Sequence, residues 1–167
     1  TLGETGSFCA SERFVDQPSP GACSAFLVGP DLIATSGQCI SDESDCGRFA
    51  FVFGFRMAEP DVPVLDFDPS QVYFCEGILQ NRLEEEGPDW AIVRLDREVE
   101  DRPPLAVRRE GLLEQGRVLL AIGHPFGLPL KISDGAEVRN NDQEGFFIAN
   151  IDAAYGKFKV LHNVNIS

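Results

Sequence analysis

The chain has 167 residues, of which 43% are apolar, so it can bury a hydrophobic core as one domain or as two small lobes. Its 27 acidic residues outnumber the 14 basic ones, and the resulting formal net charge of −13 disfavours nucleic acid and anionic membranes as partners. No apolar run approaches the roughly 18 residues of a membrane span, which predicts a soluble protein.

Short runs rich in Val, Ile and Phe alternate with turn signals along the whole chain and predict an all-β fold. The expected strands are 23–29, 32–36, 48–55, 72–79, 90–95, 117–123, 131–139, 145–151 and 157–164. Many of them are too apolar for a sheet with one solvated face, so we expect closed or paired barrels. The charges of 78–86, the longest helical candidate, favour a strand end that runs into a solvated loop. A proline pair predicts a linker at 100–104 between a 1–100 lobe and a 105–167 lobe.

All five cysteines lie in the first half of the chain, and none forms the CxxC pair typical of a zinc ribbon or a thioredoxin-like site. Disulfides in an oxidising compartment fit this pattern best, which predicts a secreted or periplasmic protein, and buried free thiols are the alternative. The odd number leaves one cysteine without a partner. The cysteines are Cys9, Cys23, Cys39, Cys46 and Cys75.

The segment 23–39, CSAFLVGPDLIATSGQC, resembles the strand–turn–strand of trypsin-like serine peptidases that ends in TAAHC or TAGHC. In that family the two cysteines at this spacing are bridged, which implies a Cys23–Cys39 disulfide. The resemblance places the general base at Gln38. A glutamine amide cannot accept the proton of the nucleophile near neutral pH, so the usual chemistry stops at this position.

The segment 89–99, DWAIVRLDREV, resembles the second landmark of the family, in which an Asp opens a strand. Asp89 is therefore the retained triad position. In a working triad this carboxylate orients the histidine, and without the ring it loses that purpose. We favour a structural role, in which Asp89 accepts hydrogen bonds from backbone N–H groups and forms a satisfied buried pair with the Gln38 amide.

The segments 117–139 and 146–160 resemble the second barrel of the bacterial glutamyl-endopeptidase-like branch, where the nucleophile lies in GNSGS. The alignment places Gly156 at the oxyanion turn and Phe158 at the nucleophile, and phenylalanine has no nucleophilic atom. No serine lies between positions 133 and 167. His124 is a candidate substitute base, but its Gly-Pro turn favours a loop role, and His162 has no motif around it.

The family continues beyond this point with further strands, so the resemblance implies a truncated second barrel with an open sheet. A protein partner, a second copy or a missing C-terminal segment is expected to cover it. We expect Cys46 and Cys75 to pair, which leaves Cys9 over. The two distant histidines and scattered acids lack metal-ligand spacing, and no cofactor is expected.

The sequence therefore predicts a catalytically inactive serine-peptidase homologue, a secreted pseudoprotease that acts by binding another protein. The alternative is a truncated or inactivated form of a secreted trypsin-like or glutamyl-type serine endopeptidase. In that case the parent protein is an enzyme, although this chain lacks the general base and the nucleophile.

Overall fold

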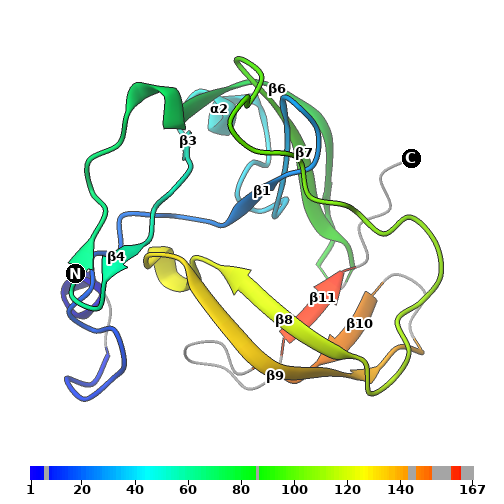
Figure 1. Ribbon diagram of the computed structural model, residues 1–167. Helices are drawn as coiled ribbons and strands as arrows, with labels where there is room; N and C mark the ends of the chain where they lie inside the picture. The colour runs from blue at the N-terminus through cyan, green and yellow to red at the C-terminus, as the bar shows by residue number, and fades with distance from the viewer. Residues whose placement is uncertain (6–7, 86, 143–145, 152–158, 163–167) are drawn as a thin grey trace.

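The structure is a computed structural model that describes residues 1–5, 8–85, 87–142, 146–151 and 159–162, the last four by their backbone only (Figure 1). Strands dominate it, which confirms the predicted all-β fold class. Most of its strands fall into two antiparallel sheets, one built before residue 100 and one after residue 117.

The first sheet has five strands in the order β1-β2-β7-β6-β3 and curls into a half-barrel (Figure 1). Its strands are β1 (Ala25–Leu27), β2 (Leu32–Thr35), β3 (Ala50–Val52), β6 (Val72–Leu83) and β7 (Asp89–Leu95). The apolar runs of β2 and β7 place side chains in one buried cluster, against which partly buried residues such as Phe51 and Ile78 pack. The cluster consists of Leu27, Ile33, Ile40, Tyr73, Ala91, Val93, Leu95 and Val99.

The strand β6 is twelve residues long and bends where its pairing with β7 shifts register. The shifts fall between Cys75 and Gly77 and between Ile78 and Gln80, and such bulges allow a long strand to follow a curled sheet. The strand extends to Leu83. The charged segment 78–86, the longest helical candidate in the sequence, therefore begins as the predicted strand end.

The second sheet has the order β11-β10-β9-β8. Its strands are β8 (Val118–Gly123), β9 (Lys131–Asn140), β10 (Phe146–Ala149) and β11 (Lys159–His162). A smaller apolar cluster covers one of its faces, formed by Ala136, Val138, Phe147, Ala149 and Ile151. The predicted linker at 100–104 contains no strand, and on either side of it Val99 N–H donates to Pro30 and Leu105 N–H to Leu27 of the first sheet.

Five short elements lie where the sequence shows only loops and turns, because each is too short for a periodic pattern. They are α1 (Leu2–Thr5), α2 (Glu43–Cys46), the hairpin β4 (Met57–Glu59) and β5 (Val62–Pro63), η1 (Pro69–Gln71) and η2 (Pro125–Gly127), with the hairpin counted once. Asp42 starts α2 as its N-cap, since its side chain accepts from the N–H groups of Ser44 and Asp45.

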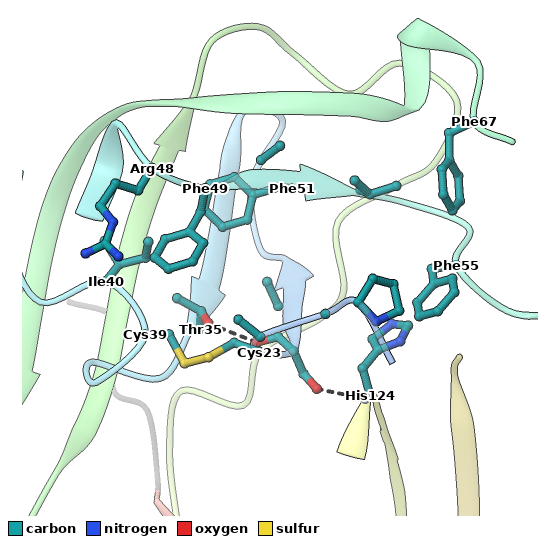
Figure 2. A pocket seen from close by; sticks show the side chains of 17 residues that line it. Cys23, Thr35, Cys39, Ile40, Arg48, Phe49, Phe51, Phe55, Phe67 and His124 are labelled. Atoms are coloured by element: carbon teal, nitrogen blue, oxygen red, sulfur yellow. Dashed lines mark hydrogen bonds between the residues drawn. A yellow bond between two sulfur atoms is a disulfide. The ribbon is translucent and has the colours of Figure 1, made fainter. Parts of the chain in front are cut away.

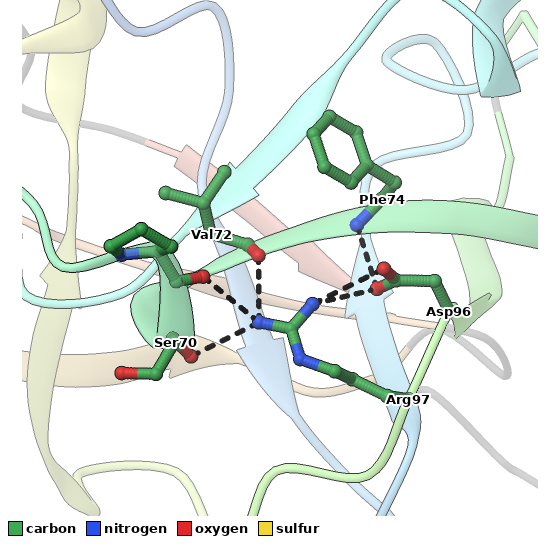
Figure 3. A network of polar contacts seen from close by, with 6 residues as sticks. Ser70, Val72, Phe74, Asp96 and Arg97 are labelled. Atoms are coloured by element: carbon green, nitrogen blue, oxygen red, sulfur yellow. Dashed lines mark hydrogen bonds and ion pairs between the residues drawn. The ribbon is translucent and has the colours of Figure 1, made fainter.

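A guanidinium after β7 ties the start of β6 in place (Figure 3). Arg97 donates to the carbonyls of Pro69, Ser70 and Val72 at 3.1, 3.2 and 2.9 Å, and it is paired with Asp96 at 3.1 Å. The Asp96 carboxylate in turn accepts from Phe74 N–H at 2.9 Å. The planar fork of arginine thus satisfies carbonyls that the sheet leaves open.

Two disulfides cross-link the first sheet, Cys23–Cys39 and Cys46–Cys75, and Cys9 is a free, exposed thiol. The first bridge joins the entry of β1 to the turn after β2. The second joins α2 to β6. The first pairing is the one that the family resemblance implies, and the second is the one expected for Cys46 and Cys75.

The turn after β8 contacts the entry of the first sheet through Gly127. Its φ is +74°, and a Cβ there would collide with the backbone of Gly21, whose N–H donates to Gly127 C=O at 3.3 Å. Nearby, Leu130 N–H donates to Phe55 C=O at 3.0 Å. The glycine therefore allows the two backbones to come close together.

Candidate functional site

The turn that follows β2 is bound to the first residue of β7 by two hydrogen bonds. The Ser36 hydroxyl donates to Oδ2 of Asp89 at 2.6 Å, and the backbone N–H of Gln38 donates to Oδ1 at 3.0 Å. Both carboxylate oxygens of Asp89 thus accept from the same turn. Bonds of this kind to an ionised group are among the stronger ones in proteins.

The end of β6 closes the other side of this turn. The side-chain amide of Asn81 donates to the carbonyls of Gly37 and Ile40 at 3.1 and 2.6 Å. A Cβ on Gly37 would collide with the carbonyl oxygen of Arg82, so this position requires glycine. The position of Gln38 is therefore fixed by β6 and β7 together.

Sequence reasoning missed Ser36, Gly37 and Asn81 as parts of this site. A signal was present for Asn81, because asparagine is depleted inside strands and its polar side chain needs partners there. Ser36 and Gly37 lie within the TSGQC motif, but their contacts depend on where β6 and β7 bring their partners.

The predicted buried pair between Asp89 and the Gln38 side chain is wrong. Gln38 is exposed, and among the described residues the partners of Asp89 are the Gln38 backbone N–H and the Ser36 hydroxyl. The reason is geometric, since these donors belong to the tight turn that faces the carboxylate. The other part of the structural role expected for Asp89, a hydrogen bond from a backbone N–H group, is present.

The remaining predicted site residues do not join this cluster. Gly156 and Phe158 lie outside the described residues, and His162 lies on β11, whose side chains are not described. None of the contacts within the described part of the chain links His124 to Gln38 or Asp89.

His124 instead belongs to the turn after β8. Its Nδ1 lies 3.0 Å from the Leu128 carbonyl oxygen, and its ring stacks on Phe55 at 5.8 Å between centroids. A carbonyl can only accept, so Nδ1 carries the proton in this contact. These contacts give His124 a structural role in the turn.

Comparison with known proteins places this geometry in a family. The trypsin-like peptidase domain family matches residues 23–157, a range that contains both Gln38 and Asp89. The chain belongs to the trypsin-like peptidase domain family. The half-barrel of the first sheet is the part of that domain which carries the Gln38 turn. No curated protein and no solved structure matches the chain.

Within the described residues we find no cluster of three or more His, Cys, Asp or Glu side chains that could hold a metal ion. In the same part of the chain, no helix has the length and apolar character needed to cross a bilayer.

Proposed function

We propose that this chain is a catalytically inactive member of the trypsin-like peptidase domain family and that it acts by binding another protein. The observation that carries the proposal is the contact between Asp89 and Gln38. A glutamine side chain cannot take up a proton near neutral pH, so no general base stands where the family's histidine would be. The Asp89 carboxylate accepts hydrogen bonds from the Ser36 hydroxyl and the Gln38 backbone N–H of this turn.

The second support is the absence of a nucleophile in the segment where the resemblance places it. Residues 134–166 contain no serine, threonine or cysteine. The alignment with the glutamyl-endopeptidase-like branch puts Phe158 at the nucleophile and Gly156 at the oxyanion turn. Loss of a triad serine or histidine alone costs about 10⁶-fold in turnover, and their joint loss costs little more because the residues act as a unit.

An exposed apolar face supports the binding role. Val118, Leu120 and Ile122 alternate along β8 and are 73%, 57% and 60% exposed, and Ile132 beside Ile122 is 65% exposed. β8 is an edge of its sheet within the described strands, and it carries neither charge nor proline to prevent pairing. Such a patch is typical of a protein interface, formed with a partner protein or with a second copy of the chain.

Two disulfides support an extracytoplasmic location, either secreted or periplasmic, because such bridges persist in oxidising compartments. The alternative is that the chain is a truncated or inactivated form of a secreted trypsin-like or glutamyl-type serine endopeptidase. The observation in its favour is that Asp89 still faces the turn that would carry the general base.

Labelling with diisopropyl fluorophosphate tests the loss of catalysis. An activated serine displaces fluoride from this reagent and forms a stable phosphoryl ester, which intact-mass spectrometry detects. We expect no adduct on this protein, under conditions in which an active serine peptidase is labelled completely. An adduct on one serine that disappears in Asp89→Asn would show a working nucleophile and refute the proposal.

The binding role has a separate test. Leu120→Lys should weaken association of the purified protein, measured by sedimentation velocity with itself and with proteins from its native source. Leu105→Lys changes a side chain of similar exposure, 60%, outside the sheet and serves as the control. Equal association of both variants would argue against β8 as the interface.

A further inference from the structure

A cavity of about 420 Å³ lies at the opening of the first sheet (Figure 2). Among the described strands β1 pairs only with β2 and β3 only with β6, so the curled sheet is not closed between β1 and β3. Pro20–Ala25 form one wall and Arg48–Val52 the other. Its size falls within the roughly 300–1,000 Å³ typical of small-molecule sites.

The inner surface of the cavity is apolar and aromatic. The rings of Phe49, Phe51, Phe55 and Phe67 line it, together with Ile40. Figure 2 shows these rings distributed along the cavity, from Phe49 near Arg48 to Phe55 near His124. An apolar molecule that enters exchanges water contacts for ring contacts, which is the main source of affinity in such sites.

Three backbone groups on the β1 side of the cavity already have hydrogen-bond partners, which disfavours an added strand along β1. Gly21 N–H donates to Gly127, the Ser24 carbonyl accepts from the Thr35 hydroxyl at 2.9 Å, and the Leu27 carbonyl accepts from Leu105 N–H at 2.9 Å. A peptide that extends a sheet requires free donors and acceptors along the edge. β3 keeps an unpaired edge among the described strands, but the apolar lining of the cavity favours a molecule that binds through its apolar surface.

One cation stands at the rim. The Arg48 side chain is 71% exposed, and its ion pair with Asp45 is long, at 3.7 Å. Asp45 accepts shorter hydrogen bonds from the N–H and hydroxyl of Ser41, at 2.9 and 2.6 Å. The guanidinium also lies over the Phe49 ring at 5.9 Å, and its fork keeps donors for a carboxylate.

The opposite end of the cavity is lined by the His124 ring, and among the described lining residues only Arg48 carries a permanent charge. His124 stacks on Phe55 and directs Nδ1 to Leu128, and Figure 2 shows it away from Arg48. The charge distribution therefore fits a molecule with one anionic end and an apolar body.

We propose that this cavity binds a small apolar monocarboxylate, with its carboxylate on Arg48 and its body between the phenylalanine rings. The site is separate from Gln38 and Asp89, which do not line the cavity. Binding here is independent of whether the protein hydrolyses peptides, so the two proposals can fail separately.

Isothermal titration calorimetry with decanoate and 1-decanol tests the proposal on the whole chain. We expect saturable 1:1 binding of decanoate, and Arg48→Gln should weaken it about tenfold while it leaves decanol binding unchanged. Arg94→Gln removes an exposed arginine that does not line the cavity and is the matched control, which should leave the affinity for both ligands unchanged. Absence of saturable decanoate binding, or an unchanged affinity in Arg48→Gln, would overturn the proposal.

A cavity-filling pair of variants tests the position of the apolar body. Ala50→Trp adds a ring to a lining position that is solvent-exposed, and it should abolish binding of both ligands with circular dichroism unchanged. Leu112→Trp adds the same ring at an exposed position that does not line the cavity and should have no effect. Normal binding in a folded Ala50→Trp variant would contradict the proposed site. So would displacement of decanoate by an extended valine–threonine peptide that protects the β3 amides from hydrogen exchange.

Discussion

The carboxylate of Asp89 accepts a hydrogen bond from the backbone N–H of Gln38 at 3.0 Å, so two residues 51 positions apart in sequence are joined at the first residue of β7. This contact, with the Ser36 hydroxyl bond beside it, uses both oxygens of Asp89. The carboxylate thus stabilises the turn whether or not the turn carries a base.

Removing this carboxylate should destabilise the fold. In Asp89→Ala the Gln38 N–H and the Ser36 hydroxyl lose a charged acceptor, and we expect a loss of about 1–3 kcal/mol in the free energy of unfolding. Urea denaturation at neutral pH measures it. Asp61→Ala, an exposed aspartate in the β4–β5 turn, is the control and should cost less than about 0.5 kcal/mol. Equal effects of the two variants would argue against a structural role for Asp89.

A methyl group at Gly37 should open the Gln38 turn. The Arg82 carbonyl is rigid backbone, so Gly37→Ala forces β6 or the turn to move, and we expect a cost of about 1–3 kcal/mol. Gly77→Ala is the matched control on β6, where a Cβ meets nothing within 4 Å. Thermal unfolding measures the stability of both variants. A Gly37→Ala protein as stable as Gly77→Ala would contradict the close approach of Gly37 to the Arg82 carbonyl.

The thiol content of the native protein should be one per chain. Cys9 is exposed and free, while the other four cysteines form two bridges. Labelling with iodoacetamide without reductant should modify Cys9 alone, and peptide mapping should link Cys23 to Cys39. Removal of that bridge in Cys23→Ala with Cys39→Ala should cost about 3 kcal/mol, given the 16-residue separation. A mapped bridge from Cys23 to any other cysteine would refute the alignment that assigns Gln38.

Acid should weaken the anchoring of α2. The hydroxyl and N–H of Ser41 hold the pKa of Asp45 below its usual value. A carboxylate with a lowered folded pKa adds stability above its unfolded pKa of about 3.9, and this stability disappears as the pH falls through the folded pKa. Ser41→Ala should therefore lower the free energy of unfolding at pH 6 and have less effect at pH 2.5. Denaturant titrations at both pH values measure the difference, and a pH-independent effect of Ser41→Ala would count against this linkage.

The sequence predicts the all-β architecture because its strands are short apolar runs bounded by Gly, Pro and Asp. The TSGQC and DWAIVRL segments also identify the family and place Gln38 and Asp89 at the ends of β2 and β7. These motifs are short stretches of sequence, so they can be recognised without knowing the tertiary contacts.

The partners of these residues were beyond sequence reasoning. Asn81 contacts Gly37 across 44 positions because the sheet brings the end of β6 beside the turn after β2, and no local pattern encodes that arrangement. The cavity between β1 and β3 likewise depends on how the five-stranded sheet curls. The prediction of a buried Asp89–Gln38 side-chain pair was wrong for the same reason, since the turn directs the backbone N–H of Gln38 toward the carboxylate.

The most direct test of the central claim is peptide hydrolysis by the native protein and by its Gln38→His variant. A mixture of unrelated peptides is incubated with each and the products are followed by mass spectrometry. We predict no cleavage above buffer for either protein, because His at position 38 restores a base and no nucleophile. Cleavage by the native protein that is lost in Asp89→Asn would contradict the account.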